Sequence, residues 1–438
     1  MIWLVMQSPA GGGHLVVPAL VLLGVATLLG VPAVVTLGGV ALVLFWAVEQ
    51  PIAAIPVAHY SLVTNPSLPT IPLFTLAGYF LAEGGAPRRL VRVFHALFGT
   101  LQGGPAIVTV LACAFFTTFT GASGVTILAL GGLLMPVLLG ARYSERNALG
   151  LLTGAGSLGL LFPPCLPLIL YGIIAKIPIE KMFLGGILPG FVLLLATAWW
   201  GVRQGLKRNE GQRRFDRREA WNALWVAKWE LLLPVVAFVA LFGGFATPVE
   251  AAAVTALYAF IVETFVYRDL KLTKDVPRLM TECGLLVGSI LLILGVALGF
   301  TNYLVDAEIP ARAVAWATHA IHSPLVFLLL LNLFLLIVGC LMDIYSAIVI
   351  QVPLLAPLGA AFGIDPVHLG IIFLANLELG YLTPPIGLNL FMSSSRFNKS
   401  VPEVLQSVVP LIILLSAGVL LITYVPALTT TLPRWFAR

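Results

Sequence analysis

Long apolar runs dominate the pattern of hydrophobic and polar positions along this chain. A helix needs about 20 apolar residues to cross the hydrocarbon core of a bilayer, and runs of that order recur over almost the whole sequence. Clear examples are residues 15–48, 183–200, 231–245 and 411–425. The pattern predicts an all-α polytopic membrane protein whose surroundings are a lipid bilayer.

Composition places the chain in the same class. Of its 438 residues, 60% are hydrophobic and only 10% are charged, and the mean hydropathy is +1.03. Soluble domains are about a quarter charged, and no polar stretch here is long enough to form one. The net charge of +5 is spread over short loops, so we expect no nucleic acid as a partner.

Residues 203–219 form the longest polar segment. They hold seven Lys or Arg against three acidic residues, so the positive-inside rule places this segment in the cytoplasm. Because the segment lies near the middle of the chain, it suggests two halves. We divide the sequence into a first repeat (1–202), a basic cytoplasmic linker (203–228) and a second repeat (229–438).

Internal similarity supports this division. The stretch LGLLFPPCLPLI at 158–169 resembles LGYLTPPIGLNL at 379–390, and Pro384 lies 221 residues after Pro163. Four matches at one offset argue for a duplicated unit, and we expect the two copies to be inverted. The same offset relates Pro136 to Pro357, Gly78 to Gly299, and Ser144 to Asp365.

Each half contains two apolar segments that are too long for one straight span and are interrupted near the middle. In the first member of each pair the interruption is a polar or glycine-containing turn, and in the second it is a Pro pair. We expect the first to be a re-entrant hairpin with its tip at membrane depth and the second to be a broken helix. The predicted hairpins are 105–140 and 324–363, and the predicted broken helices are 145–178 and 366–395.

A Pro pair removes N–H donors and frees carbonyl groups, which lipid cannot satisfy. Such carbonyls and the C-termini of half-helices bind Na⁺ in transporters, and half-helix N-termini attract anions. Interrupted helices at equivalent places in two repeats therefore point to a secondary transporter with its site near the bilayer midplane. The alternative is that both helices are merely kinked for structural reasons.

Six stretches of the chain resemble the large membrane subunit of tripartite ATP-independent periplasmic (TRAP) transporters, and together they cover nearly its full length. They are IPLFTLAGYFL (71–81), FFTTFTGASGVT (115–126), GSLGLLFPPCLPLILYG (156–172), MFLGGILPG (182–190), ATPVEAAAVTALYA (246–259) and IDPVHLGIIFLANLELGYLTPPIGLNLF (364–391).

The resemblance implies a multi-pass protein of the bacterial inner membrane that takes up an organic anion with Na⁺. It also implies the elevator-type architecture of the ion-transporter superfamily, a separate small membrane subunit and a periplasmic binding protein. This chain departs from the family at Thr120-Gly121-Ala122-Ser123, where Ser-Gly-Ser-Ser is expected. A side-chain ligand at Ala122 is therefore ruled out.

The turns and breaks supply the candidate site residues. We expect substrate contacts from hydroxyl and amide groups at Ser123, Ser157, Thr383 and Asn389. No Lys or Arg lies within either hairpin tip or either break, so hydroxyls, amides, helix N-termini and the bound cation would hold a substrate carboxylate. The candidate Na⁺ residues are Thr120, Gly121, Ser123, Gly159, Pro163, Gly339, Asp343, Gly380, Thr383 and Pro384, with Glu378 as a further possibility.

Four acidic residues in apolar surroundings are weighed against structural roles. Asp343 and Glu378 either take part in cation binding or tip geometry, or are held by nearby backbone N–H groups. Glu250 follows Thr247-Pro248, the pattern of a helix capping box, so we expect it to be structural. Asp365 before Pro366 reads in the same way.

Other functions compete with the TRAP interpretation. A single-component Na⁺- or H⁺-coupled carboxylate symporter would share the hairpins and broken helices, and is the first alternative. A cation channel or an intramembrane enzyme is a more distant one. No phosphate-binding GxxxxGK motif, catalytic triad or metal-ligand spacing occurs, so we expect no enzyme and no cofactor, with Na⁺ as the only bound metal.

Overall fold

The computed structural model describes residues 13–436 except 30, 32, 49, 207–214 and 245. All regular elements in this part are helical, and no β-strand occurs among the described residues. Seven of the described helices are long and apolar enough to cross a membrane, and the number rises to nine if each of two bent pairs is one span. The predicted class, an all-α polytopic membrane protein, is confirmed.

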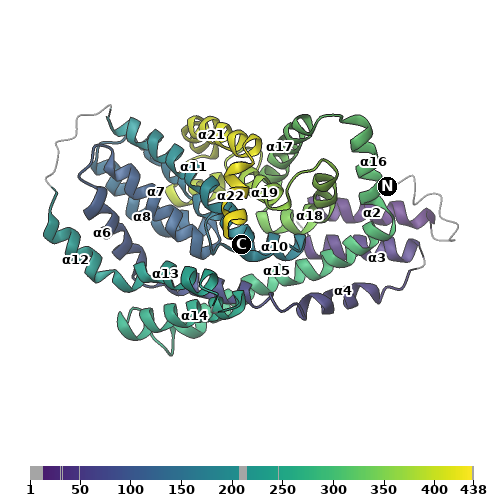
Figure 1. Cartoon of the computed structure of the whole chain (residues 1–438), viewed down its shortest axis with the longest axis horizontal. Coiled ribbons are helices and arrows are strands. Elements are labelled where there is room, and N and C mark those ends of the chain that lie inside the picture. Colours follow the sequence, from purple (N-terminus) through teal and green to yellow (C-terminus); the bar gives the residue numbers. More distant parts are fainter. Residues whose placement is uncertain are drawn as a thin grey trace.

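The first half of the chain, coloured purple to teal in Figure 1, alternates short apolar helices with longer ones. Within it, η1 is a single turn of 3-10 helix that interrupts the path from α9 to α10. The elements are α2 (Gly13–Leu28), α3 (Ala33–Ala47), α4 (Ala54–Val63), α5 (Thr70–Glu83), α6 (Ala86–Phe98), α7 (Gly104–Thr120), α8 (Ser123–Gly140), α9 (Glu145–Ala155), η1 (Leu158–Leu161), α10 (Leu166–Ala175) and α11 (Ile179–Leu206).

The second half, coloured teal to yellow, begins after the basic segment and ends in a short helix near the centre of the view (Figure 1). Its η2 is one turn of π-helix that extends α14. The elements are α12 (Arg217–Val226), α13 (Lys228–Phe242), α14 (Pro248–Ile261), η2 (Val262–Val266), α15 (Asp275–Asp306), α16 (Ile309–Ala320), α17 (Pro324–Leu341), α18 (Ile344–Ala361), α19 (Pro366–Gly380), α20 (Leu388–Phe397), α21 (Val401–Tyr424) and α22 (Ala427–Phe436).

Helices end in both halves where the sequence is interrupted. Two residues join α7 to α8, and two residues join α17 to α18. The segment formed by α9, η1 and α10 bends by 43° near the first Pro pair. The bonds Pro163–Pro164 and Pro384–Pro385 are both cis, and each follows a helix that has just ended.

Side-chain caps fix several helix starts. Thr247 and Glu250 form a capping box at the start of α14, which confirms the structural role predicted for Glu250. Asp365 accepts hydrogen bonds from the N–H groups of two residues in the first turn of α19, as predicted. Ser144, at the equivalent position of the first half, caps α9 in the same manner.

Close contacts between helices fix their relative directions. Gly150 of α9 packs on the backbone of Ser407 in α21, so these two helices start side by side. Tyr143, just before α9, donates a hydrogen bond to the carbonyl of Gly201 near the end of α11. His368, at the start of α19, contacts the carbonyl of Thr423 at the end of α21. The equivalent helices α9 and α19 therefore begin on opposite faces of the molecule.

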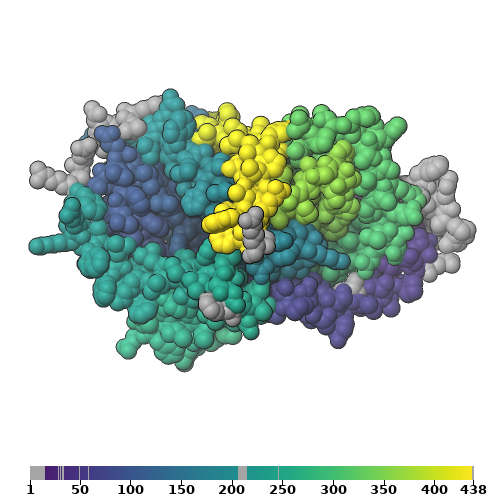
Figure 2. Space-filling view, viewed as in Figure 1, coloured from purple at the N-terminus to yellow at the C-terminus, as the bar shows by residue number. Residues whose placement is uncertain are grey.

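The end of α11 leads into the basic segment, so the positive-inside rule assigns the face where α9 and α21 begin to the cytoplasm. The C-terminal helices α21 and α22 run down the middle of the face shown in Figure 2, between the helices of the two halves. The predicted linker, residues 203–228, is not wholly irregular, because α11 extends into it and Asp216 caps α12 within it.

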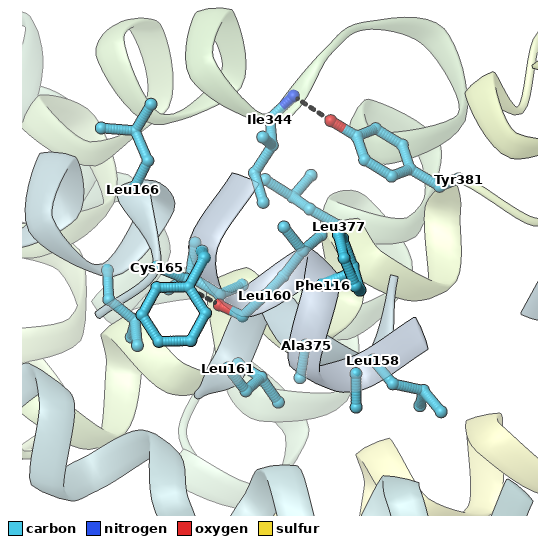
Figure 3. Close-up of a cluster of buried hydrophobic side chains, with 14 of the residues drawn as sticks. Phe116, Leu158, Leu160, Leu161, Cys165, Leu166, Ile344, Ala375, Leu377 and Tyr381 are labelled. Atoms are coloured by element: carbon cyan, nitrogen blue, oxygen red, sulfur yellow. Dashed lines mark hydrogen bonds between the residues drawn. The ribbon is translucent and has the colours of Figure 1, made fainter. Parts of the chain in front are cut away.

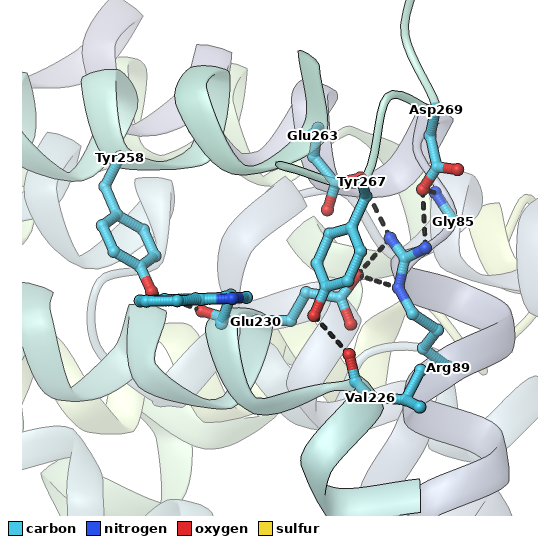
Figure 4. Close-up of polar contacts among 9 residues, drawn as sticks. Gly85, Arg89, Val226, Glu230, Tyr258, Glu263, Tyr267 and Asp269 are labelled. Atoms are coloured by element: carbon cyan, nitrogen blue, oxygen red, sulfur yellow. Dashed lines mark hydrogen bonds and ion pairs between the residues drawn. The ribbon is translucent and has the colours of Figure 1, made fainter. Parts of the chain in front are cut away.

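Arg89 of α6 forms ion pairs with residues of α13, of η2 and of the segment that follows η2 (Figure 4). Its guanidinium forms ion pairs with Glu230 of α13, with Glu263 of η2 and with Asp269, at 2.5, 3.1 and 2.6 Å. The side chain also lies over the ring of Tyr267, 3.7 Å from its centroid. Burial opposes the charge of Arg89, but hydrogen bonding to Glu230 and Asp269 raises the pKa of Arg89 above its usual value.

Replacing Arg89 by Gln should destabilise the protein strongly, because it leaves the fully buried carboxyl groups of Glu230 and Glu263 without their cation. Loss of one partner from a buried ion pair costs about 3–5 kcal/mol. The matched control is Arg92→Gln on the same helix. Its partner Glu219 is nearly half exposed and solvent screens the pair, so the loss should be much smaller than for Arg89→Gln. Equal shifts in the thermal unfolding of the two purified variants would contradict this account.

Candidate functional site

The α7–α8 turn and the α17–α18 turn meet and line a small cavity of about 220 Å³, which is partly open because Asp343 and Leu128 in its wall are exposed. The first residues of α20 and the residue after α19 complete its wall. The described lining contains one acidic side chain and no Lys or Arg. It consists of Gly121, Ala122, Ser123, Gly124, Val125, Leu128, Asp343, Tyr345, Tyr381, Leu388 and Met392.

Two tyrosines tie the turns together. The Tyr345 hydroxyl of α18 donates a hydrogen bond to the Gly121 carbonyl at 2.6 Å, and so joins the two turns directly. The Tyr381 hydroxyl accepts a hydrogen bond from the N–H of Ile344 at 2.8 Å, which anchors the start of α18 to the break after α19. Sequence reasoning missed both residues, although each lies within three positions of a predicted site residue.

Gly121 ends α7 in the left-handed conformation, with φ of 64°. A Cβ at this position would lie 2.8 Å from the Cβ of Leu166, so both backbone geometry and packing require glycine. The carbonyl groups in the last turn of a helix such as α7 have no partners within the helix. The C-terminus of this half-helix therefore carries the partial negative charge that suits a cation.

Asp343 is the N-cap of α18. Its carboxylate accepts hydrogen bonds from the N–H groups of Tyr345 and Ser346 at 3.0 Å and from the Ser346 hydroxyl at 2.6 Å. The carboxylate is thus held by backbone N–H groups, as one of the two interpretations expects, and the cation-binding role of Asp343 stays a prediction. Ala122, at the equivalent position of the first turn, begins α8 without a side-chain cap.

Buried oxygen atoms without a hydrogen-bond partner are concentrated at the predicted site. The described part of the chain has ten buried side-chain N or O atoms without a partner, and five belong to four predicted residues. A buried polar atom without a partner costs about 1–3 kcal/mol, so such a concentration favours a site that a bound ion, a ligand or water completes. The five atoms are Oγ of Ser123, Oγ of Ser157, both carboxyl oxygens of Glu378 and Oδ1 of Asn389.

The first break packs tightly against α7. A Cβ on Gly159 would lie 2.3 Å from the carbonyl oxygen of Ala114 and 2.4 Å from the backbone nitrogen of Thr118. In the second half, a Cβ on Gly380 would lie 2.6 Å from the backbone of Gly339. The first break therefore packs against α7 and the second against α17. In both places glycine is needed because a side chain would overlap the neighbouring backbone.

An apolar layer lies behind the turns and contributes to the single large core of the molecule (Figure 3). Phe116 of α7, Leu160 of η1 and Leu377 of α19 belong to it, and all three are buried. Gly159 and Leu161 at the first break are buried in the core, whereas Pro384, Pro385 and Ile386 at the second break are exposed.

The structure separates the predicted residues into two groups. Only Gly121, Ser123 and Asp343 line the cavity between the turns. Among the others, the Thr383 hydroxyl donates to the Gly380 carbonyl at 2.9 Å, and the Thr120 hydroxyl donates to the Phe116 carbonyl. The residues that do not line the cavity are Thr120, Ser157, Gly159, Pro163, Gly339, Glu378, Gly380, Thr383, Pro384 and Asn389.

A helical membrane protein whose interrupted helices meet around a central cavity has the architecture of a secondary transporter. Residues 20–428 match the family described as "Tripartite ATP-independent periplasmic transporter, DctM component". The chain therefore belongs to the TRAP transporter family, as a large permease component and a multi-pass protein of the bacterial inner membrane.

Named relatives agree with this assignment, and a solved structure shares the fold. The chain is 35% identical to the C4-dicarboxylate TRAP transporter large permease DctM of Pseudomonas aeruginosa, over 86% of this chain and 87% of that protein. It is 34% identical to the isethionate TRAP transporter permease DctMQ of Oleidesulfovibrio alaskensis, over 93% of this chain but 64% of that protein. The YdaH transporter of Alcanivorax borkumensis has a similar fold, with a TM-score of 0.60, 14% identity and 87% of each chain covered.

Replacing Gly380 by Ala should separate α19 from α17 and destabilise the protein, because the new Cβ overlaps the Gly339 backbone. Overpacking of this kind costs about 1–3 kcal/mol. Gly140→Ala is the control, since nothing lies within 4 Å of a Cβ at that helix end. Thermal unfolding in detergent measures both variants. The packing argument fails if Gly380→Ala melts with the native protein.

Proposed function

We propose that this chain is the permease through which a TRAP transporter moves an organic anion into the cell, driven by Na⁺. The observation that carries the proposal is the meeting of two helix-interrupting turns at a cavity lined by Ser123, whose buried hydroxyl oxygen has no partner. Ser157 and Asn389, near the two breaks, also have unpartnered buried oxygens. Hydroxyl, amide and main-chain oxygens are the ligands that alkali cations prefer in such sites. These residues therefore fit a sodium ion and the polar groups of a small anion.

Inverted repeats and re-entrant hairpins belong to the same proposal. They are supported by the matching order of elements in the two halves and by the opposite directions of α9 and α19. In this arrangement the two turns approach the bilayer midplane from opposite faces. We propose that the unit carrying both turns moves as a rigid elevator against the remaining helices.

The substrate class follows from the site and from the relatives. No cationic side chain lines the cavity between the turns, so helix N-termini and polar side chains would hold the anion together with the bound cation. The relatives carry the names of a C4-dicarboxylate and an isethionate transporter. We propose a small carboxylate or sulfonate as substrate, delivered by a periplasmic binding protein to this chain and a small membrane subunit.

Sodium should stabilise the folded protein. A ligand of the native state at about ten times its Kd adds roughly 1.4 kcal/mol, so the purified chain should melt at a higher temperature in Na⁺ than in K⁺ at equal ionic strength. Ser123→Ala should reduce this difference by removing an unpartnered oxygen. The control is Ser416→Ala, whose hydroxyl is bonded within its own helix. If the folded protein melts at the same temperature in both salts, the result contradicts Na⁺ coupling and favours coupling to protons.

Uptake should require all the partners. Proteoliposomes that contain this chain and the small membrane subunit should accumulate labelled succinate or isethionate only with an inward Na⁺ gradient and added binding protein. Equal accumulation without the binding protein would favour a single-component symporter. Accumulation that follows a proton gradient in place of Na⁺ would contradict sodium coupling but would leave anion transport intact.

A further inference from the structure

A second cavity, of about 620 Å³, shares α8 and α20 with the cavity between the turns. We propose that it is the release subsite of the carrier, in which Arg396 and Arg88 receive the carboxylate or sulfonate of the departing anion. This inference rests on the function proposed above. It adds the cavity in which the anion binds last before release and the positively charged side chains that bind it there. Its wall is formed by Ala82, Glu83, Gly84, Gly85, Pro87, Arg88, Ala129, Gly132, Leu133, Asp269 and Arg396.

The two cavities share two helices. On α20, Leu388 and Met392 line the cavity between the turns, and Arg396, one helical turn further on, lines the second cavity. On α8, Leu128 lines the first cavity and Ala129 lines the second. The two cavities therefore follow one another along α8 and α20, in the direction of the end of α20.

The end of α20 is at the cytoplasmic face. It leads directly into α21, whose first turns lie beside the start of α9 on the face assigned to the basic linker. Lys399, between α20 and α21, forms an ion pair with Glu145 at the start of α9 at 2.7 Å, which confirms that the two starts are neighbours. An anion that leaves the turns along α8 and α20 therefore exits toward the cytoplasm.

The charged side chains of the second cavity fall into two groups. Its two acidic residues are paired, because Glu83 binds Arg278 at 2.8 Å and Asp269 binds Arg89 at 2.6 Å, and both of these arginines also pair with acidic residues outside the cavity. Arg88 and Arg396 have no ion pair and no side-chain hydrogen bond to any residue that the structure describes. Two exposed guanidinium groups with free donors thus line one cavity. An anion with a flat, charged oxygen group is the ligand that such groups bind best.

Two glycines hold Arg396 in place. The side chain crosses α8 over Gly131 and Gly132, and a Cβ on Gly132 would lie 2.1 Å from a guanidinium nitrogen of Arg396. Larger residues here would push the guanidinium away from the cavity. The positive charge is therefore placed by the close contact between α8 and α20.

The test measures the charge and the openness of this cavity without requiring transport. Cysteine is introduced at Ala129, and the full chain in inside-out vesicles is treated with an anionic thiol reagent, 2-sulfonatoethyl methanethiosulfonate, or with its trimethylammonium counterpart. The four native cysteines are buried and set the background. The anionic reagent should react faster. Loss of one nearby unit charge changes the local concentration of each ion about threefold, so Arg396→Gln should lower the rate ratio by about tenfold.

Arg312→Gln, an exposed arginine of α16 outside the cavity, is the matched control and should leave the ratio unchanged. Gly132→Ala should act like Arg396→Gln, since it moves the same guanidinium. Absent labelling, equal rates for both reagents, or a ratio that does not respond to Arg396→Gln would overturn the proposal.

A second measurement tests release itself. In exchange assays with succinate or isethionate, Arg396→Gln should raise the half-saturating concentration at the cytoplasmic face severalfold and leave the periplasmic value unchanged. An equal change at both faces would place Arg396 outside the release step. If no anion is transported by the native complex, the proposed function fails, while the labelling ratio still decides whether the cavity is positively charged.

Discussion

The ends of an α-helix leave backbone N–H and C=O groups without partners, and the hydrocarbon of a bilayer supplies none. Every helix that stops inside this protein must therefore end against other protein groups. The α7–α8 and α17–α18 turns meet this requirement by ending against each other and against the breaks. The hydrogen bond from Tyr345 to the Gly121 carbonyl is the most direct example, because it satisfies a helix end with a side chain from the opposite turn.

This constraint also explains why the site is where it is. Backbone groups that are satisfied by tight glycine contacts, as at Gly159 and Gly380, leave little space for anything else. The unpartnered buried oxygens of Ser123, Ser157, Glu378 and Asn389 belong to residues at or close to these interruptions along the chain. The helix interruptions and the polar atoms near them thus both follow from the need to satisfy helix ends inside the protein. An ion or a polar ligand is the natural way to complete such a region.

Charge is distributed in a complementary manner. Basic side chains are absent from the described lining of the cavity between the turns, but two unpaired arginines line the neighbouring cavity at the cytoplasmic end. Arg89, which pairs with the buried Glu230 and Glu263, also pairs with Asp269 in the wall of that second cavity. A charge placed at the exit attracts an anion without holding it at the centre, where tight binding would slow its passage.

The sequence by itself determined the class of the protein and the places where its helices stop. Apolar length, the Pro pairs and the Gly-Ala-Ser turn fix these features because they depend on local chemistry, namely lost N–H donors and backbone freedom. The caps at Thr247 and Asp365 were predictable for the same reason. The segment at 217–226 was harder, since an amphipathic helix in a polar linker is stabilised by its packing on α6.

Only the tertiary structure decided which predicted residues meet. Asp343 was singled out for its apolar neighbours, but its hydrogen bonds to the start of α18 depend on the exact turn that the chain makes. Tyr345, Tyr381 and Arg396 carry no local signal, because their roles come from partners more than 30 positions away along the chain. Contacts between distant segments arise from packing, and no short stretch of sequence contains the partner that gives such a residue its function.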